Sequence, residues 1–296
     1  MSALAFMLLA FALAGPVPAV LARASWPMRA PRAAIVLWQA VAAAAVLSAF
    51  SAGLAIASRL FVGEAAALAW PLWLCSVGVL ALTLLIGIRL VVAVLKVAVG
   101  TRRRRAHHRM MVDLLGECHH DLDGVRVLGV PEPLAYCLPG VRSRVVLSEG
   151  TLSTLNDTEL AATLRHERAH LRARHDLVLE AFIAVHTAFP RFVRSGSALN
   201  AVRLLVELLA DDAAVRAVGP TPVARALVAC AAARTPAGAM AAGGPTTVIR
   251  VRRLSGPPNS LALSLAAYLG AAAVLIVPTV ALAVPWLTEL RRLFHI

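Results

Sequence analysis

The sequence predicts a mainly α-helical, multi-pass membrane protein with one α+β domain inserted between its third and fourth membrane helices. Hydrophobic residues make up 59% of the 296 residues, which is more than soluble globular proteins carry. They gather into long uninterrupted runs, whereas most polar residues lie in one central stretch. We therefore expect a membrane region at 1–99, a soluble domain at 100–258 and a last membrane segment at 259–296.

Four apolar runs are long enough to cross a hydrocarbon layer about 30 Å thick, which takes roughly 20 helical residues. They cover residues 2–21, 33–58, 65–95 and 261–287. The first run has no basic residue ahead of its apolar stretch, and the segment Gly15-Pro16-Val17-Pro18 interrupts it. We therefore expect a kinked membrane helix there and not a signal peptide.

The distribution of arginine predicts how the chain is oriented in a cell membrane. The net charge is +13, and Lys96 is the single lysine. Basic residues flank the first loop, the end of the third run and the start of the fourth: Arg23, Arg29, Arg32, Lys96, Arg102–Arg105, Arg250, Arg252 and Arg253. Because basic residues favour the cytoplasmic side, we expect residues 100–258 inside the cell and both termini outside.

The run Arg102–Arg105 has two readings, a nucleic-acid patch or a contact with the lipid bilayer. It directly follows an apolar run and has neither interleaved aromatic residues nor a DNA-reading motif. We expect it to contact lipid headgroups, and we expect no direct binding to nucleic acid. The cysteines Cys75, Cys118, Cys137 and Cys230 form no Cys-x-x-Cys pair, which suits a reducing compartment.

Within the soluble stretch we expect a helix near 106–118, two strands, and then mostly helices. The strands are expected at 124–130 and 143–150, separated by "PEPLAYCLPG", which forms either a turn or an edge strand. The helices are expected at 157–187, 198–217 and 221–233, followed by a flexible loop at 234–247.

The stretch "RHERAHLRARHD" lies on the first of these three helices. Asn156 and Glu159 form a capping pair that predicts the start of the helix ahead of it. At about 100° per residue, His166, Glu167 and His170 share one sector of the helix. This His-Glu-x-x-His pattern supplies two imidazole ligands for zinc and a carboxylate that can take a proton from water. Arg165, Arg168 and Arg172 fall on the opposite face, where we expect solvent or headgroups.

Two carboxylates compete for the third zinc ligand. Asp176 follows His170 by six residues, but its use requires a sharp turn that usually needs glycine, and position 173 is alanine. Glu207 lies on a later helix together with Asp211, one turn further on. We favour Glu207 as the ligand, with Asp211 hydrogen-bonded to a ligand histidine. Nearby, Tyr136 is either an oxyanion donor or a core residue, and we expect Cys137 to be packed.

The motifs "AYCLPG", "SRVVLSEGTL", "DTELAATLRHERAHLRARHD" and "VELLADD", flanked by membrane helices, resemble the BlaR/MecR-type membrane metallopeptidases (metallopeptidase family 56). That family is related to the HtpX and CAAX-prenyl proteases. The resemblance implies a gluzincin-like metalloprotease domain with one zinc ion held by His166, His170 and Glu207. It also implies that Glu167 is the catalytic base and that Asp211 lies behind the zinc ligands and supports them. His175 matches a histidine common after this motif in the HtpX-like branch.

By the same resemblance, the protein substrate is a cytoplasmic winged-helix repressor of the BlaI/MecI type, cleaved in signal transduction. The β-lactam receptors carry a penicillin-binding domain after their last span, whereas nine residues follow Leu287 here. We therefore do not expect this chain to sense β-lactams in that way. Two alternatives remain, an HtpX-like protease for membrane-protein quality control and a non-proteolytic signalling scaffold with structural zinc.

Overall fold

The structure is a computed structural model that describes residues 3–57, 70–119, 122–140, 143–189, 196–233 and 244–294. It is mostly helical and contains a small four-stranded sheet. Two compact units can be distinguished and are described separately. The first comprises Met1–Leu95, Phe182–Val202 and Ser260–Ile296, and the second comprises Lys96–Ala181 and Arg203–Asn259.

Four stretches are long and apolar enough to cross a membrane, as the sequence predicts: Ala3–Arg23, Pro31–Ala57, Trp70–Leu115 and Leu261–Ala281. The first consists of α1 (Ala3–Ala14) and α2 (Pro16–Arg23), which are separated at Gly15. This is the expected kink, because proline lacks the N–H that continues a helix. Residue 2, residue 58 and residues 65–69 of the expected runs lie outside the described residues.

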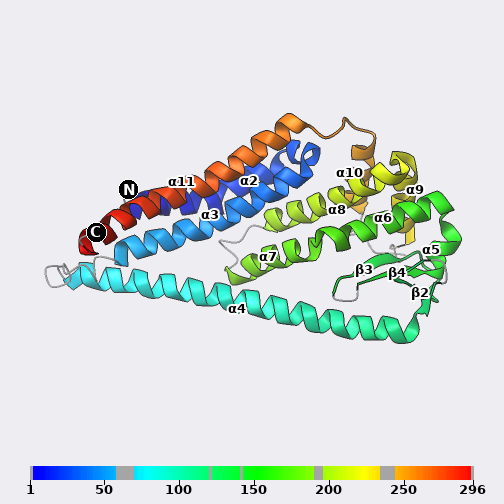
Figure 1. Cartoon of the computed structure of the whole chain (residues 1–296), viewed down its shortest axis with the longest axis horizontal. Coiled ribbons are helices and arrows are strands. Elements are labelled where there is room, and N and C mark those ends of the chain that lie inside the picture. The colour runs from blue at the N-terminus through cyan, green and yellow to red at the C-terminus, as the bar shows by residue number, and fades with distance from the viewer. Residues whose placement is uncertain are drawn as a thin grey trace. The chain divides into compact units, whose positions relative to one another are not determined.

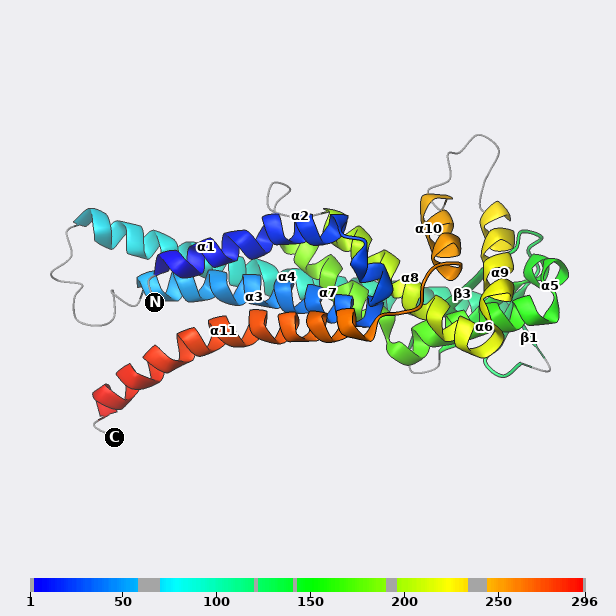
Figure 2. The same cartoon turned by 90° about the horizontal axis from the view of Figure 1, so that it is seen from above.

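In the first unit, α3 (Pro31–Ala57) packs against both α1 and α11 (Leu261–Phe294), which lie beside it in both views (Figures 1 and 2). Small side chains make this packing close. Ala33, Ala34 and Ala44 are at most 1% exposed, and Ala33 belongs to a cluster with Ala267 of α11. Small residues let helix backbones approach each other, which is how helices associate in a bilayer.

Helix α4 (Trp70–Leu115) is 46 residues long and differs from the expectation. The separate helix expected near 106–118 is the C-terminal part of α4, so the third apolar run and the soluble domain share one continuous helix. Between the apolar run and the end of the helix, Gly100 is the one glycine, and the arginines that follow it are good helix formers. The helix ends at Gly116, whose N–H donates to the carbonyl of Val112 at 2.9 Å.

The sheet contains β1 (Glu117–Cys118), β2 (Val125–Leu128), β3 (Ala135–Leu138) and β4 (Arg144–Ser148) in the order β1-β2-β4-β3. Strands β2 and β4 are parallel, and the other pairs are antiparallel. The segment "AYCL" is therefore an edge strand, one of its two expected forms. Strand β1 was not expected from the sequence.

The sheet lies between two helices of the second unit, α4 on one side and α6 (Asp157–Ala173) on the other (Figure 1). Val146 of the central strand β4 packs with Val112 of α4, whereas Val145 and Leu147 pack with Leu164 of α6. Both faces of β4 are buried, which explains why its apolar residues are consecutive and do not alternate with polar ones. The arrangement fixes α6 directly on the sheet.

Further helices complete the second unit: α5 (Glu149–Thr154), α7 (His175–Ala188), α8 (Gly196–Val218), α9 (Pro220–Ala233) and α10 (Gly244–Leu254). Of these, α7 and α8 continue into the first unit. The helical sequence expected at 157–187 is confirmed, but it forms two helices, α6 and α7. It breaks at Arg174, which adopts a left-handed conformation with φ of 51°. Residues 244–247 of the expected loop belong to α10, and residues 234–243 lie outside the described residues.

The predicted cap of α6 is present. The Asn156 side chain accepts from the backbone N–H of Thr158 at 3.1 Å and of Glu159 at 3.0 Å, and the Glu159 carboxylate accepts from the N–H of Asn156 at 3.2 Å. These bonds satisfy donors that the first turn of a helix leaves unpaired. The cap therefore fixes where the histidine-bearing helix begins.

We predict that Asn156→Ala lowers the free energy of unfolding by about 1 kcal/mol, because it removes the acceptor at the start of α6. In thermal unfolding of the full-length protein, the midpoint should fall by about 2–4 °C. Asn156→Asp keeps an acceptor and serves as the control, and its midpoint should stay near that of the wild type. Equal midpoints for Asn156→Ala and the wild type would contradict the role of the cap.

Candidate metal centre

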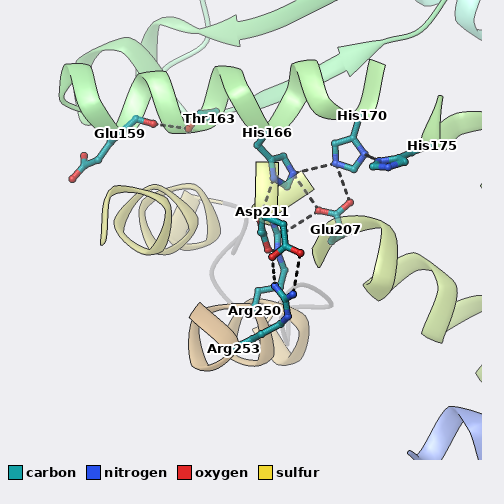
Figure 3. Close-up of polar contacts among 10 residues, drawn as sticks. Glu159, Thr163, His166, His170, His175, Glu207, Asp211, Arg250 and Arg253 are labelled. Carbon is teal, nitrogen blue, oxygen red and sulfur yellow. Dashed lines mark hydrogen bonds and ion pairs between the residues drawn. The ribbon is translucent and has the colours of Figure 1, made fainter. Parts of the chain in front are cut away.

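The side chains of His166, His170 and Glu207 converge in the second unit (Figure 3). Both histidines extend from α6, four residues apart and therefore on one face, whereas Glu207 extends from α8. The potential ligand atoms of the three residues all lie within 4.8 Å of one another. Among the described residues, these three form the one group of His, Cys, Asp or Glu side chains that lie close enough together to hold a metal ion.

The distances within this group fit one zinc ion. The two Nε2 atoms of His166 and His170 are 3.1 Å apart, and they lie 3.4 and 3.6 Å from the carboxylate oxygens of Glu207. Ligand atoms about 2.1 Å from a tetrahedral zinc ion are separated by about 3.4 Å. Two nitrogens, one carboxylate oxygen and this spacing are the features of a catalytic zinc site that leaves a fourth position for water.

Asp211 orients the first histidine. It lies one turn after Glu207 on α8, is 1% exposed, and places Oδ1 3.0 Å from Nδ1 of His166. If Nε2 of His166 holds a metal ion, Nδ1 carries the ring proton and donates it to this carboxylate. The contact lies where it can fix both the tautomer and the direction of the imidazole, which is the role that the spacing of Glu207 and Asp211 predicts.

His175 orients the second histidine, and the sequence did not indicate how. It is the first residue of α7, directly after the break at Arg174, and it is 5% exposed. Its Nδ1 lies 3.0 Å from Nδ1 of His170, and burial lowers the pKa of His175. A neutral His175 can accept the Nδ1 proton of His170, which leaves Nε2 of His170 directed at Glu207.

Arg250 of α10 is a further member of the site that was missed from the sequence, where it was interpreted as a basic residue beside a membrane helix. Its Nε and Nη2 donate to the two oxygens of Asp211 at 2.8 and 2.7 Å, and its Nη1 lies 3.0 Å from Glu207 (Figure 3). Such a two-pronged contact is the strong form of an arginine–carboxylate pair. Arg250 therefore links both carboxylates of α8 to α10.

The pKa values of the group reflect these contacts. Burial opposes the charged form of His166, but hydrogen bonds to Asp211 and Glu207 outweigh it and raise its pKa to about 9. Burial and the charge of His166 lower the pKa of His170 to about 4. Burial also opposes ionisation of Glu207 and Asp211, yet His166 and Arg250 bring both pKa values down to about 2. The site therefore stabilises negative carboxylates and attracts positive charge.

Glu167 lines the same cavity as His166 and Glu207, beside the candidate ligands. Its neighbour across the sheet edge is Cys137 of β3, whose thiol hydrogen-bonds to the Glu167 carboxylate. Burial raises the pKa of Cys137, and the charge of Glu167 raises it further, so this thiol stays protonated and is not suited to bind metal. A carboxylate in this position can act as a base toward a molecule held by the three ligands.

Other candidate residues lie away from the three ligands. Asp176 is paired with Arg105 of α4 at 3.0 Å and with Arg174 at 3.5 Å. The chain turns sharply at Arg174, between α6 and Asp176, although position 173 is alanine and not glycine. The missing glycine is therefore not what keeps Asp176 out of the ligand group. Tyr136 packs in the cluster on the α4 side of the sheet and contacts His108 at 3.0 Å. It therefore takes the core role and not that of an oxyanion donor.

The arginines of the stretch "RHERAHLRARHD" do not line the cavity. Arg165 and Arg172 are exposed, Arg168 is half-buried, and the cavity lining contains none of them. This agrees with the helical periodicity of about 100° per residue, which places the three arginines on the face opposite His166 and His170.

Comparison with known proteins gives one family. The family model described as peptidase family M48 matches residues 101–257, which is more than half of the chain and includes every residue of the site. Peptidases of this family are typically zinc-dependent, which agrees with the grouping of two histidines and a glutamate. No curated protein and no solved structure matches the chain.

We predict that Asp211→Asn weakens zinc binding by roughly 10- to 100-fold, because the amide cannot replace the charge that orients His166. The zinc dissociation constant of the purified full-length protein, measured against a competing chelator, checks this. Asp212→Asn is the matched control, since Asp212 is the neighbour of Asp211 on α8 but pairs with Arg253 at 2.7 Å and with Asn259 at 2.8 Å. Equal weakening in both variants would show a general effect of charge and contradict the orienting role.

We also predict that zinc affinity rises with pH. His166 has a pKa of about 9 and must lose its proton to bind zinc, whereas His170, at about 4, is already neutral near pH 7. The affinity should therefore rise about tenfold per pH unit from pH 6 to 8 and level off above pH 9. Affinity that is constant over pH 6–8 would contradict this assignment.

Proposed function

Because the chain belongs to peptidase family M48, we propose that it is a membrane-anchored zinc endopeptidase whose active site is the cavity between α6, α8 and α9. The observation that carries the proposal is that His166, Glu167, His170 and Glu207 converge on one cavity. A purely structural zinc site has no use for a carboxylate such as Glu167 beside the metal.

Zinc, when bound, supplies Lewis-acid activation of water and of the peptide carbonyl. His166, His170 and Glu207 would hold it, while Asp211 and His175 keep the two imidazoles in position. Glu167 takes the proton of the attacking water and delivers it to the leaving amine. Arg250, which lines the cavity, stabilises the negative charge that develops on the carbonyl oxygen.

The substrate backbone pairs with β3. This strand is at one edge of the sheet, and Cys137 within it contacts Glu167. An extended peptide that added to the free edge of β3 would run past the catalytic carboxylate. Such pairing uses main-chain hydrogen bonds, so it holds many sequences in one register.

For the biological role we propose regulated proteolysis of a cytoplasmic winged-helix repressor of the BlaI/MecI type. The support is the resemblance of the motifs to the BlaR/MecR metallopeptidases, together with four candidate membrane helices. The basic residues beside the spans support a domain on the cytoplasmic side and extracytoplasmic termini. The protein would then convert a signal at the membrane into the loss of a repressor.

A second candidate role is quality control of membrane proteins, as in the HtpX-like proteases. One observation favours it, namely that the matching family is M48 whereas the motifs resemble family 56. The two roles differ in the substrate. A dedicated antirepressor cleaves one folded partner, whereas a quality-control protease degrades many misfolded chains.

We predict that Glu167→Gln reduces peptide hydrolysis by at least roughly 100-fold, because the amide cannot accept the proton of water. The purified full-length protein is supplied with zinc, and cleavage of a peptide mixture is followed by mass spectrometry. Zinc content should stay at the level of the wild type, since Glu167 is not a proposed ligand. Full activity in this variant would overturn the catalytic assignment.

Expression of wild type and Glu167→Gln in cells distinguishes the three roles. Accumulation of one uncut winged-helix repressor in the variant supports regulated proteolysis, whereas accumulation of many misfolded membrane proteins supports quality control. If Glu167→Gln still relieves repression, the protein acts as a non-proteolytic scaffold. Arg168→Gln is the matched control, because Arg168 lies beside Glu167 in the chain but off the cavity.

A further inference from the structure

In the second unit, a cluster of ion pairs holds the start of α7 against α4. Arg105 of α4 places Nη1 3.0 Å from Oδ2 of Asp176 and Nη2 2.6 Å from Oε1 of Glu180. The side chains of Asp176 and Glu180 are only 8% and 14% exposed. Carboxylates with so little access to water need a partner of opposite charge, and Arg105 supplies it for both.

Two contacts one turn apart also fix how α7 is rotated about its own axis. Asp176 and Glu180 are four residues apart and therefore lie on one face of the helix. A guanidinium that binds both, with one nitrogen for each, holds that face toward α4. His175 precedes Asp176 and points about 100° away around the axis. The rotation that turns Asp176 toward Arg105 is therefore also the one that turns His175 toward His170.

The other described contacts of this turn hold it less firmly. Arg174 also approaches Asp176, but at 3.5 Å and with a side chain that is 56% exposed. Leu177 in the same turn is 48% exposed, so its apolar packing is weak. Among the described residues, His170 is the one hydrogen-bond partner of the His175 side chain. The contact between these two histidines therefore depends on how α7 is placed.

The contact between His175 and His170 bears on metal binding. The two Nδ1 atoms are 3.0 Å apart (Figure 3), which lets His175 accept the ring proton of His170. With Nδ1 engaged in this way, Nε2 of His170 is directed at Glu207. A ligand histidine that loses such a partner binds metal less tightly, typically by roughly 10- to 100-fold. A displaced α7 would therefore weaken the metal site from a distance.

We propose that Arg105 is a positioning residue for the zinc ligand His170, and that it acts through α7 and His175. This rests on the zinc site of the proposed peptidase, but it concerns metal binding and not hydrolysis. Among the described residues, the partners of Arg105 are Asp176 and Glu180 and none of the three ligands. Arg105 acts by keeping one face of α7 on α4, so that His175 meets His170.

The test is a double-mutant cycle on zinc affinity, measured in the purified full-length protein against a competing chelator. Arg105→Gln should weaken zinc binding roughly tenfold, and His175→Ala should weaken it roughly 10- to 100-fold. The variant with both changes should bind zinc within about threefold of His175→Ala alone, because the effect of Arg105 passes through His175. Losses that simply add up in the double variant would overturn the proposal, since they would show that Arg105 acts independently of His175.

Arg104→Gln is the matched control, because Arg104 is the exposed neighbour of Arg105 in the same run, and it should leave zinc affinity unchanged. Arg105→Lys covers the case in which Arg105→Gln does not fold. Lysine keeps the charge but has no planar fork for two carboxylates, so zinc binding should weaken roughly threefold, and not at all further in a His175→Ala background.

Zinc affinity equal to that of the wild type in a folded Arg105→Gln or Arg105→Lys variant would overturn the positioning role while the zinc site itself stands. Absence of zinc binding by the wild type would overturn the metal centre, and with it both the proposed peptidase and this inference.

Discussion

Asp211 is a fully buried carboxylate that bonds to His166 on one side and to Arg250 on the other. A buried charge is tolerated only when its oxygens are paired, so this residue cannot move without a large cost. Its partners come from α6 and α10 while Asp211 itself belongs to α8, so satisfying one carboxylate fixes three helices. Glu207 lies one turn away on α8 and is thereby held opposite the Nε2 atoms of both histidines. The geometry of the ligand group depends on this contact.

The same contact controls the charge of the site. Three carboxylates, those of Glu167, Glu207 and Asp211, face a single guanidinium, that of Arg250, which leaves two negative charges when the histidines are neutral. A divalent cation balances them. The raised pKa of His166 has the same origin, because a proton there relieves part of the same negative charge. Without Arg250, the buried carboxylates would repel each other more strongly, so this residue keeps the ligand group together and still leaves room for the ion.

The parts of this site that could be predicted from the sequence are those set by local periodicity. Helical spacing places His166 next to His170, and the same rule places Glu207 next to Asp211. Apolar length likewise predicts the membrane helices. Arg250 was missed because α10 has no clear helical signal, since glycine, proline and β-branched residues precede this arginine. Its role depends on contacts with a helix about 40 residues earlier, which spacing cannot indicate. The break at Arg174 was missed because an arginine rarely adopts a left-handed conformation.

After the break at Arg174, the consecutive residues His175 and Asp176 bind different partners. His175 turns back to His170, whereas Asp176 is paired with Arg105 of α4, which also binds Glu180 at 2.6 Å. Arg105 belongs to a run of four arginines that looks uniform in the sequence, yet its three neighbours are exposed and it alone is held by carboxylates. The run therefore combines three exposed basic residues with one that is held by carboxylates inside the fold. Since α4 is also a candidate membrane helix, the second histidine is connected through α7 to a helix that continues into the apolar part of the chain.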